Sequence, residues 1–174
     1  MNINRRSALK YFIIVGAGTV LLPTCKPSPK KISAYNNLSV DEDQQALLAT
    51  IAATIIPDTG TPGAEQVSAH IFALQMLNDC YEQKDRDRFL KGMEQFSKNV
   101  KDKYKKSFTE CSANERNTII AAINAQKDAG DDAAYFYSTL KGLTVHAYTS
   151  SKYYLTNVQE YKLVPGKFKS RVPV

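Results

Sequence analysis

The side chains best able to bind a metal or a cofactor are two histidines and three cysteines in a chain of 174 residues. His70 and His146 both fall within helical patterns, and neither has a Cys, His, Asp or Glu partner at a recognised ligand spacing. The cysteines form no CxxCH haem-attachment motif, no CxxC pair and no ferredoxin-type run. The sequence therefore predicts no metal-binding residue and no covalently attached haem.

Motifs for catalysis and nucleotide binding are also missing from the sequence. There is no GxSxG elbow, no phosphate-cradling glycine-rich loop, no HExxH pair and no dinucleotide-binding fingerprint. The acidic residues Asp41, Glu42 and Asp43 stand at the start of a predicted helix, where the helix dipole favours anions. We therefore expect no catalytic residue and no cofactor-binding residue in this chain.

The most specific local signal is at the N-terminus, where Arg5 and Arg6 precede a hydrophobic run over residues 11–22. A membrane-spanning helix needs about 20 apolar residues, so this run is too short to span a bilayer and suits a signal peptide. The paired arginines resemble the twin-arginine export signal, which is an address and not an anchor. An ordinary secretory signal with a basic start is the alternative. We predict that residues 1–24 are a twin-arginine-type signal segment, read by the twin-arginine translocase, and that the protein is exported to the periplasm.

Cys25 follows this segment in a context that looks like a lipobox, with Leu22 three positions before it. Pro23 and Thr24 differ from the small residues that are usual just before the cysteine. Residues 25–37 are rich in proline and lysine, which suits a short extended tether. We predict that Cys25 is lipidated and that the membrane is contacted only through this anchor. A non-lipidated cysteine near a conventional cleavage site is the alternative.

Two cysteines remain if Cys25 is acylated. Cys80 and Cys111 are an even pair in a compartment that permits disulfides, and they lie on different predicted elements. A disulfide between them and two buried free thiols are both compatible with the sequence.

The charge of +6 includes three basic residues of the signal segment, so the remainder of the chain carries +3. Its basic residues are scattered, apart from a denser stretch of lysines between Lys98 and Lys106 near the end of a helical pattern. Cations are favoured at that end by the helix dipole, and a nucleic-acid site would need more clustering. We therefore expect no nucleic-acid partner.

Hydrophobic residues recur at helical spacing in five segments. The first opens at a capping-box pattern, Ser39-Val40-Asp41-Glu42, and Pro57 ends it. A second capping box, Ser112-Ala113-Asn114-Glu115, opens the fourth helix, and Asp131 with Asp132 precedes the fifth. The apolar positions are, in chain order, Leu47, Leu48, Ile51 and Ile55; Val67, Ile71, Leu74 and Leu77; Phe89, Met93, Phe96, Val100 and Tyr104; Ile119, Ile120 and Ile123; and Phe136, Leu140, Leu143 and Ala147. The predicted fold is all-α: residues 38–174 form a single irregular bundle of about five helices with an extended C-terminal segment.

The last 26 residues, Thr149 to Val174, are rich in aromatic side chains and show no helical period. Such a segment must either pack over its own domain or cover a partner. Aromatic side chains bury much area and keep a polar tip, so they are enriched at the centres of interfaces. We predict a partner interface here, and the alternative is that these rings seal the domain's own core. The predicted interface residues are Tyr148, Tyr153, Tyr154, Tyr161 and Phe168.

The order of these features resembles the gluconate 2-dehydrogenase subunit 3 family, the small (gamma) subunits of membrane-associated gluconate 2-dehydrogenases. The matching elements are Arg5-Arg6, Leu47 to Pro57 leading into Thr61-Pro62-Gly63-Ala64, Leu143-Thr144 through Tyr148-Thr149-Ser150, and Tyr161 through Pro165-Gly166-Lys167-Phe168 with Pro173. The chain departs from many relatives at Ser170-Arg171, where Gly-Cys is expected.

The resemblance implies a non-catalytic subunit that has no cofactor of its own. In such complexes a large flavoprotein of the glucose-methanol-choline (GMC) class binds FAD and oxidises a sugar, polyol or sugar acid. A cytochrome c or another acceptor takes the electrons. The large subunit often lacks a signal and is carried through the twin-arginine route by the small one. A stand-alone envelope lipoprotein that binds no enzyme is the alternative function.

Overall fold

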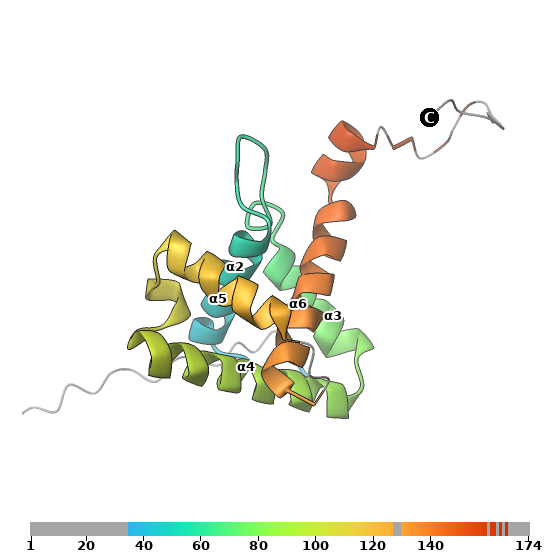
Figure 1. The fold of residues 1–174 in the computed structure, drawn as a ribbon. Helices are drawn as coiled ribbons and strands as arrows, with labels where there is room; N and C mark the ends of the chain where they lie inside the picture. The colour runs from blue at the N-terminus through green and yellow to red at the C-terminus, as the bar shows by residue number, and fades with distance from the viewer. Residues whose placement is uncertain (1–34, 127–129, 160, 163, 165, 167–174) are drawn as a thin grey trace, which may run out of the picture.

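A computed structural model describes residues 35–126, 130–159, 161, 162, 164 and 166. Within these residues the chain forms five α-helices, one 3-10 turn and one π-helical turn, and no β-strand. In chain order the elements are α2 (Glu42–Ile55), α3 (Ala69–Cys80), α4 (Gln83–Tyr104), η1 (Phe108–Glu110), α5 (Ala113–Ala125), α6 (Asp132–Thr149) and η2 (Tyr154–Val158). The all-α bundle is confirmed. Figure 1 shows α4 crossing the base of the bundle and α6 rising from it to the opposite end.

Most of the predicted apolar positions form the core or pack against it, because each helix turns its hydrophobic face toward the others, whereas Ile71 of α3 is half-buried and belongs to neither core cluster. All the predicted positions of α6 are buried, as are those of α4 except Tyr104, which is half-buried. The rings of Phe89 and Phe136 lie with centroids 4.9 Å apart, and the Phe96 ring is 5.6 Å from that of Phe136. These three aromatic side chains join α4 to α6, the two helices with the most extensive mutual contact.

Gly92 allows α4 and α6 to approach closely at their crossing. A Cβ atom at this position would lie 2.1 Å from the backbone oxygen of Asp132 and 2.8 Å from Cβ of Phe136. The first turn of α6 therefore occupies the space that a side chain at residue 92 would need. Beside the crossing, the Asp132 carboxylate accepts hydrogen bonds from Arg88 Nε at 3.0 Å and pairs with Lys91 Nζ at 2.7 Å.

Helix starts were predicted well for α5 and α6 and incorrectly for the first helix. Ser112 and Glu115 form the expected capping box, and Asp131 accepts a hydrogen bond from Ala133 N at 2.9 Å. The cap of α2 is Asp41 instead of Ser39, and its partner is Gln44. A helix that began at Ser39 would not place Val40 and Leu38 as they are, buried side by side in the extended segment before the cap.

Two other elements differ from the sequence-based prediction. The second helix begins at Ala69 and not at Val67, because the chain passes through a left-handed residue at Ser68, where φ is 53°. The region after Thr149 is not wholly extended, since the backbone is helical from residue 152 to 158. A segment of two turns is too short to show a hydrophobic period.

A second, smaller core joins the loop between α2 and α3 to the C-terminal half of α6. It consists of the small side chains of Ala52, Ala64, Ala69 and Ala147. Gly63 makes the loop compact, because a Cβ there would lie 2.7 Å from both Asp58 N and Ile56 O. The Thr61–Ala64 element and the end of α6, which are far apart in the sequence, thus meet at one end of the bundle.

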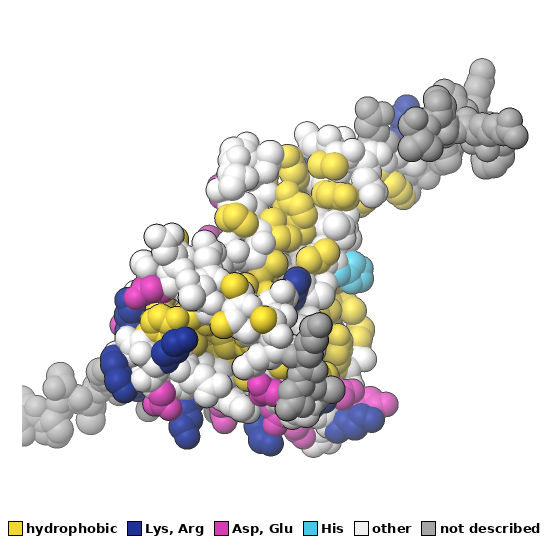
Figure 2. Space-filling model, in the orientation of Figure 1, with side chains coloured by type: hydrophobic (Ala, Val, Ile, Leu, Met, Phe, Trp, Pro, Cys, Tyr) yellow, Lys and Arg dark blue, Asp and Glu magenta, His cyan; other side chains and the backbone are white. Residues whose placement is uncertain are grey.

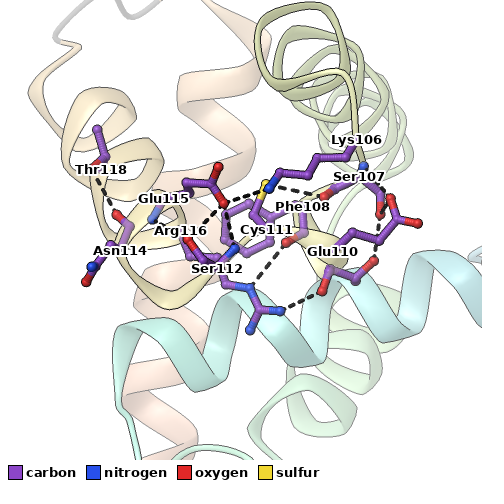
Figure 3. A network of polar contacts seen from close by, with 11 residues as sticks. Lys106, Ser107, Phe108, Glu110, Cys111, Ser112, Asn114, Glu115, Arg116 and Thr118 are labelled. Atoms are coloured by element: carbon purple, nitrogen blue, oxygen red, sulfur yellow. Dashed lines mark hydrogen bonds and ion pairs between the residues drawn. The ribbon is translucent and has the colours of Figure 1, made fainter.

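A polar network fixes the connection between α4 and α5 (Figure 3). The Glu115 carboxylate accepts hydrogen bonds from Ser112 N at 2.7 Å, Ser112 Oγ at 2.8 Å and Lys106 Nζ at 2.8 Å. These donors, the Lys106 ammonium first, lower the pKa of Glu115 from 4.5 to about 2. Arg116 donates to the backbone oxygens of Phe108 and Thr109 and so closes the 3-10 turn onto α5.

Replacing Gly92 by alanine should destabilise the bundle, because the new methyl group would overlap a backbone oxygen that cannot move without shifting α6. We expect a loss of about 1–3 kcal/mol or more in the free energy of unfolding, measured by chemical denaturation. Gly142→Ala in α6 is the matched control, since a Cβ there meets nothing within 4 Å. It should be neutral or stabilising by up to about 1 kcal/mol, through helix propensity. Equal stability of the Gly92→Ala and Gly142→Ala variants would contradict the close approach of α4 and α6 at Gly92.

The lowered pKa of Glu115 predicts how stability depends on pH. Because the folded-state pKa lies below the ordinary value of 4.5, the carboxylate stabilises the protein above that pH and the contribution is lost as pH falls toward 2. Glu115→Gln should therefore unfold at a lower temperature than the wild type near neutral pH, and the gap should narrow between pH 4.5 and 2. Glu94→Gln, at an exposed position of α4, is the control. A difference in unfolding temperature between Glu115→Gln and the wild type that stays constant with pH would refute the lowered pKa of Glu115.

Candidate functional site

The residues predicted to bind a partner are divided between α6 and the segment that follows it. Tyr148 is half-buried on the last turn of α6, and Tyr153 and Tyr154 are half-buried in the next helical segment. The Tyr148 and Tyr154 rings meet edge to face with centroids 5.8 Å apart. Tyr161 is 54% exposed. Phe168 lies outside the described residues, as do Arg5, Arg6 and Cys25 of the predicted signal and anchor.

We call the described residues from Ser150 to Gly166 the C-terminal arm. Ser150 and Ser151 lie at the break between α6 and the helical part of the arm. Ser150 Oγ donates to the His146 oxygen at 2.7 Å, and Ser151 Oγ accepts from Tyr154 N at 3.2 Å. The first side chain thus ends α6 and the second begins the next helical segment, in the manner of an N-cap.

The helical part of the arm is wider than an α-helix. Gln159 N donates to the Tyr154 oxygen at 3.0 Å, a bond across five residues, and Tyr161 N then folds back to the Leu155 oxygen at 2.7 Å. The segment from Tyr154 to Val158 is therefore a π-helical turn. Such turns are rare and occur frequently at functional sites.

The arm contributes nothing to either hydrophobic core of the described chain. None of its described residues is buried, and none packs against a core cluster. Figure 1 shows the arm continuing away from the bundle beyond the end of α6. The large hydrophobic side chains that are exposed in the described chain all lie on the arm or just before it: Val145 at 43%, Val158 and Tyr161 at 54%, and Val164 at 80%.

The apolar surface continues from the arm along α6 (Figure 2). A groove of about 410 Å³ between α5 and α6 runs up to Val145, and Ile123, Ala134 and Tyr137 contribute its apolar lining. Lys141 crosses its edge and donates to Asn124 Oδ1 at 2.8 Å. An exposed apolar surface of this kind is typical of a site that binds another macromolecule.

Sequence reasoning missed the valines at residues 145, 158 and 164, because an exposed valine looks like a core valine in the sequence. The only available signal was their position after the last strong helical period. The turn at residues 152–158 also escaped notice, although Ser151 followed by Tyr153-Tyr154-Leu155 is compatible with a capped helix start.

The side chains that could bind a metal or act in catalysis are dispersed over several elements in the described part of the chain. His70 lies on α3, and burial lowers the pKa of its imidazole more than the nearby charge of Glu65 raises it. Its Nδ1 atom is buried without a hydrogen-bond partner among the described residues. His146 lies on α6 with its ring edge to face with Phe72, at 5.3 Å between centroids. No group of three His, Cys, Asp or Glu side chains among the described residues is arranged to bind a metal ion.

Both described cysteines are free thiols. Cys80 is exposed at the end of α3, whereas Cys111 is buried after η1, where desolvation raises the pKa of its thiol. A raised pKa leaves less thiolate and so a weaker nucleophile. Among the described helices, none is both long and apolar enough to cross a membrane.

Comparison with known proteins identifies the family to which this chain is related. The family model for gluconate 2-dehydrogenase subunit 3 matches residues 42–166, a range that begins with α2 and ends with the arm. Comparisons with curated proteins and with solved structures found no match. The matched range contains both the loop at Thr61–Ala64 and the end of α6, the two elements that the small alanine core brings together. The chain therefore belongs to the gluconate 2-dehydrogenase subunit 3 family.

Proposed function

We propose that this chain is the non-catalytic small subunit of an exported flavin-dependent dehydrogenase, and that it escorts and stabilises the large subunit. The partner is a GMC-type flavoprotein that binds FAD and oxidises a sugar, polyol or sugar acid, with a cytochrome c or another acceptor taking the electrons. The main support for the proposal is the arm of this chain, which belongs to the family. The exposed apolar side chains of the arm do not pack in the core of the described residues.

Several features of the arm support a role in binding. Tyr148 and Tyr154 are in ring contact, so part of the surface is ordered before a partner arrives. The backbone bonds at Gln159 and Tyr161 restrict the arm further. A binding segment that is already ordered loses less conformational entropy on docking, which favours affinity. The alternative in which the tail rings seal the core is not supported by the exposure of the arm.

The escort role follows from the order in which a flavoprotein matures. A flavoprotein that loads FAD in the cytoplasm must cross the membrane already folded, and the twin-arginine route carries folded proteins. A signal on residues 1–24 of a tightly bound small subunit would serve both chains. Lipidation of Cys25 would then retain the complex at the membrane surface, because several acyl chains anchor a protein stably whereas one does not.

The export proposal predicts that Arg5→Lys/Arg6→Lys leaves this protein in the cytoplasm together with its flavoprotein. Cell fractionation with antibodies against both chains measures this, and intact-mass analysis of the exported wild type shows whether residue 25 carries acyl chains. Changing Lys30 and Lys31 of the tether to Arg is the control and should leave export unchanged. Normal periplasmic accumulation of the double-Lys variant would exclude the twin-arginine route. Export of the flavoprotein alone would exclude the escort role.

The interface proposal predicts that truncation after Ser150 abolishes co-purification of the flavoprotein while the bundle stays folded. Since no described residue of the arm is buried, the free energy of unfolding should change by only about 0.5 kcal/mol. Truncation after Gly166, which removes Phe168, should weaken the complex without abolishing it. The readouts are flavin absorbance and mass-spectrometric identification of the captured partner. A folded chain that ends at Ser150 and still binds the flavoprotein would place the interface elsewhere.

A further inference from the structure

Charge is distributed unevenly between the helical body and the C-terminal part of the chain. Residues 35–132 contain 11 basic and 16 acidic residues, a net charge of −5. Residues 133–174 contain 6 basic residues and one acidic residue, a net charge of +5. After residue 34, the part of the chain that carries the exposed apolar side chains is therefore also the cationic part, and residues 1–34 carry six further basic residues and no acidic one.

The cations of the arm have no described carboxylate as a partner. Lys152 and Lys162 are exposed, and neither ammonium group forms an ion pair with a described Asp or Glu. Some cations of the body do form ion pairs, whereas Lys98 and Lys101 of α4, like the arm lysines, form none with a described carboxylate. Lys106 pairs with Glu115, and Lys91 and Arg88 pair with Asp132. The charges of the arm are thus not used by the described fold.

The same cations adjoin the exposed apolar side chains. Lys162 directly follows Tyr161 and precedes Val164, and Lys152 directly precedes the two half-buried tyrosines. Protein interfaces commonly have an apolar centre and a polar, charged rim. An arm on which exposed lysines adjoin tyrosine and valine in the chain is complementary to an apolar surface edged by carboxylates.

We propose that the arm docks on a surface of the flavoprotein that is apolar at its centre and edged by Asp and Glu side chains, with Lys152 and Lys162 selecting that surface. This inference rests on the proposed function and adds the chemistry by which the partner is recognised. Complementary charge raises the association rate and excludes wrong partners, so the arm would find its site quickly even when both chains are dilute.

Two other binding partners of the arm would also carry negative charge complementary to its lysines, but they are less well supported. A second copy of this chain has an acidic body, but several of its acids are already used, Asp41 and Asp131 as helix caps and Glu115 and Asp132 in ion pairs. An anionic lipid surface attracts lysine, but the chain contains no Trp, and the large hydrophobic side chains exposed on the described arm are only Val158, Tyr161 and Val164.

The test compares two double charge reversals in the full chain, captured from its native host together with the flavoprotein. Lys152→Glu/Lys162→Glu should weaken the complex by about tenfold or more, because like charges would then face each other across the rim. Lys98→Glu/Lys101→Glu on α4 changes the net charge equally at exposed positions and should change binding by less than about twofold. The wild-type complex should also weaken as salt is raised from about 50 to about 500 mM.

Thermal unfolding of each variant separates binding from folding, because lysines near helix ends also interact with the helix dipole. If the reversal at the arm lowers stability, Lys152→Gln/Lys162→Gln replaces it and should still weaken binding severalfold. An intact wild-type complex that is insensitive to salt and to the arm variants overturns this inference and leaves the proposed function standing. Failure of the wild type to capture any flavoprotein overturns both.

Two further measurements test the other occupants. Sedimentation with vesicles of phosphatidylglycerol and phosphatidylcholine shows whether the arm lysines bind anionic lipid, and light scattering shows whether they support a dimer. We expect the wild type and the arm variant to behave alike in both. Loss of vesicle binding or of a dimer on reversal of the arm lysines, without loss of the flavoprotein, would overturn the inference.

Discussion

The close approach of α4 and α6 at Gly92 determines the arrangement on which the rest of the structure depends. Helices usually pack with side chains between them, so contact of one helix with the backbone of another requires a residue without a Cβ. With Asp132 directly over Gly92, the rings of Phe89, Phe96 and Phe136 fill the space around the crossing. The base of α6 is thereby fixed, and its direction determines where the chain leaves the bundle.

At its other end, α6 packs through small side chains, which let it lie close to its neighbours. Ala147 packs with Ala52, Ala64 and Ala69, which brings the loop before α3 against the last turns of α6. The loop is itself closed by the backbone contacts at Gly63 and by the hydrogen bond from Ala64 N to Ile56 O. A rigid support of this kind holds the root of the arm, while no described residue of the arm itself is buried.

This division of roles suits a subunit whose proposed task is to bind. The body has ordinary core packing and caps, which are sufficient for stability without a metal or disulfide at this size. The described arm carries exposed apolar groups, and its lysines form no ion pair with a described carboxylate, so both are available to a partner. In the described chain, the features that stabilise the fold and those available for binding thus occupy different residues.

The sequence by itself determined the five α-helices and most of their buried faces, because those depend on local periodicity, capping side chains and proline. Ser112, Asp131 and Pro57 each act within a few residues, and each was read correctly. Ser39 was chosen wrongly over Asp41 because both fit a capping pattern, and only the burial of Leu38 and Val40 against the core distinguishes them. The family resemblance was also carried by local motifs and is confirmed.

Only the tertiary structure decided which apolar residues remain exposed outside the core. Val158 and Val164 are exposed because of where α6 points after its crossing with α4. That direction arises from contacts between residues distant in the chain, and no local pattern contains it.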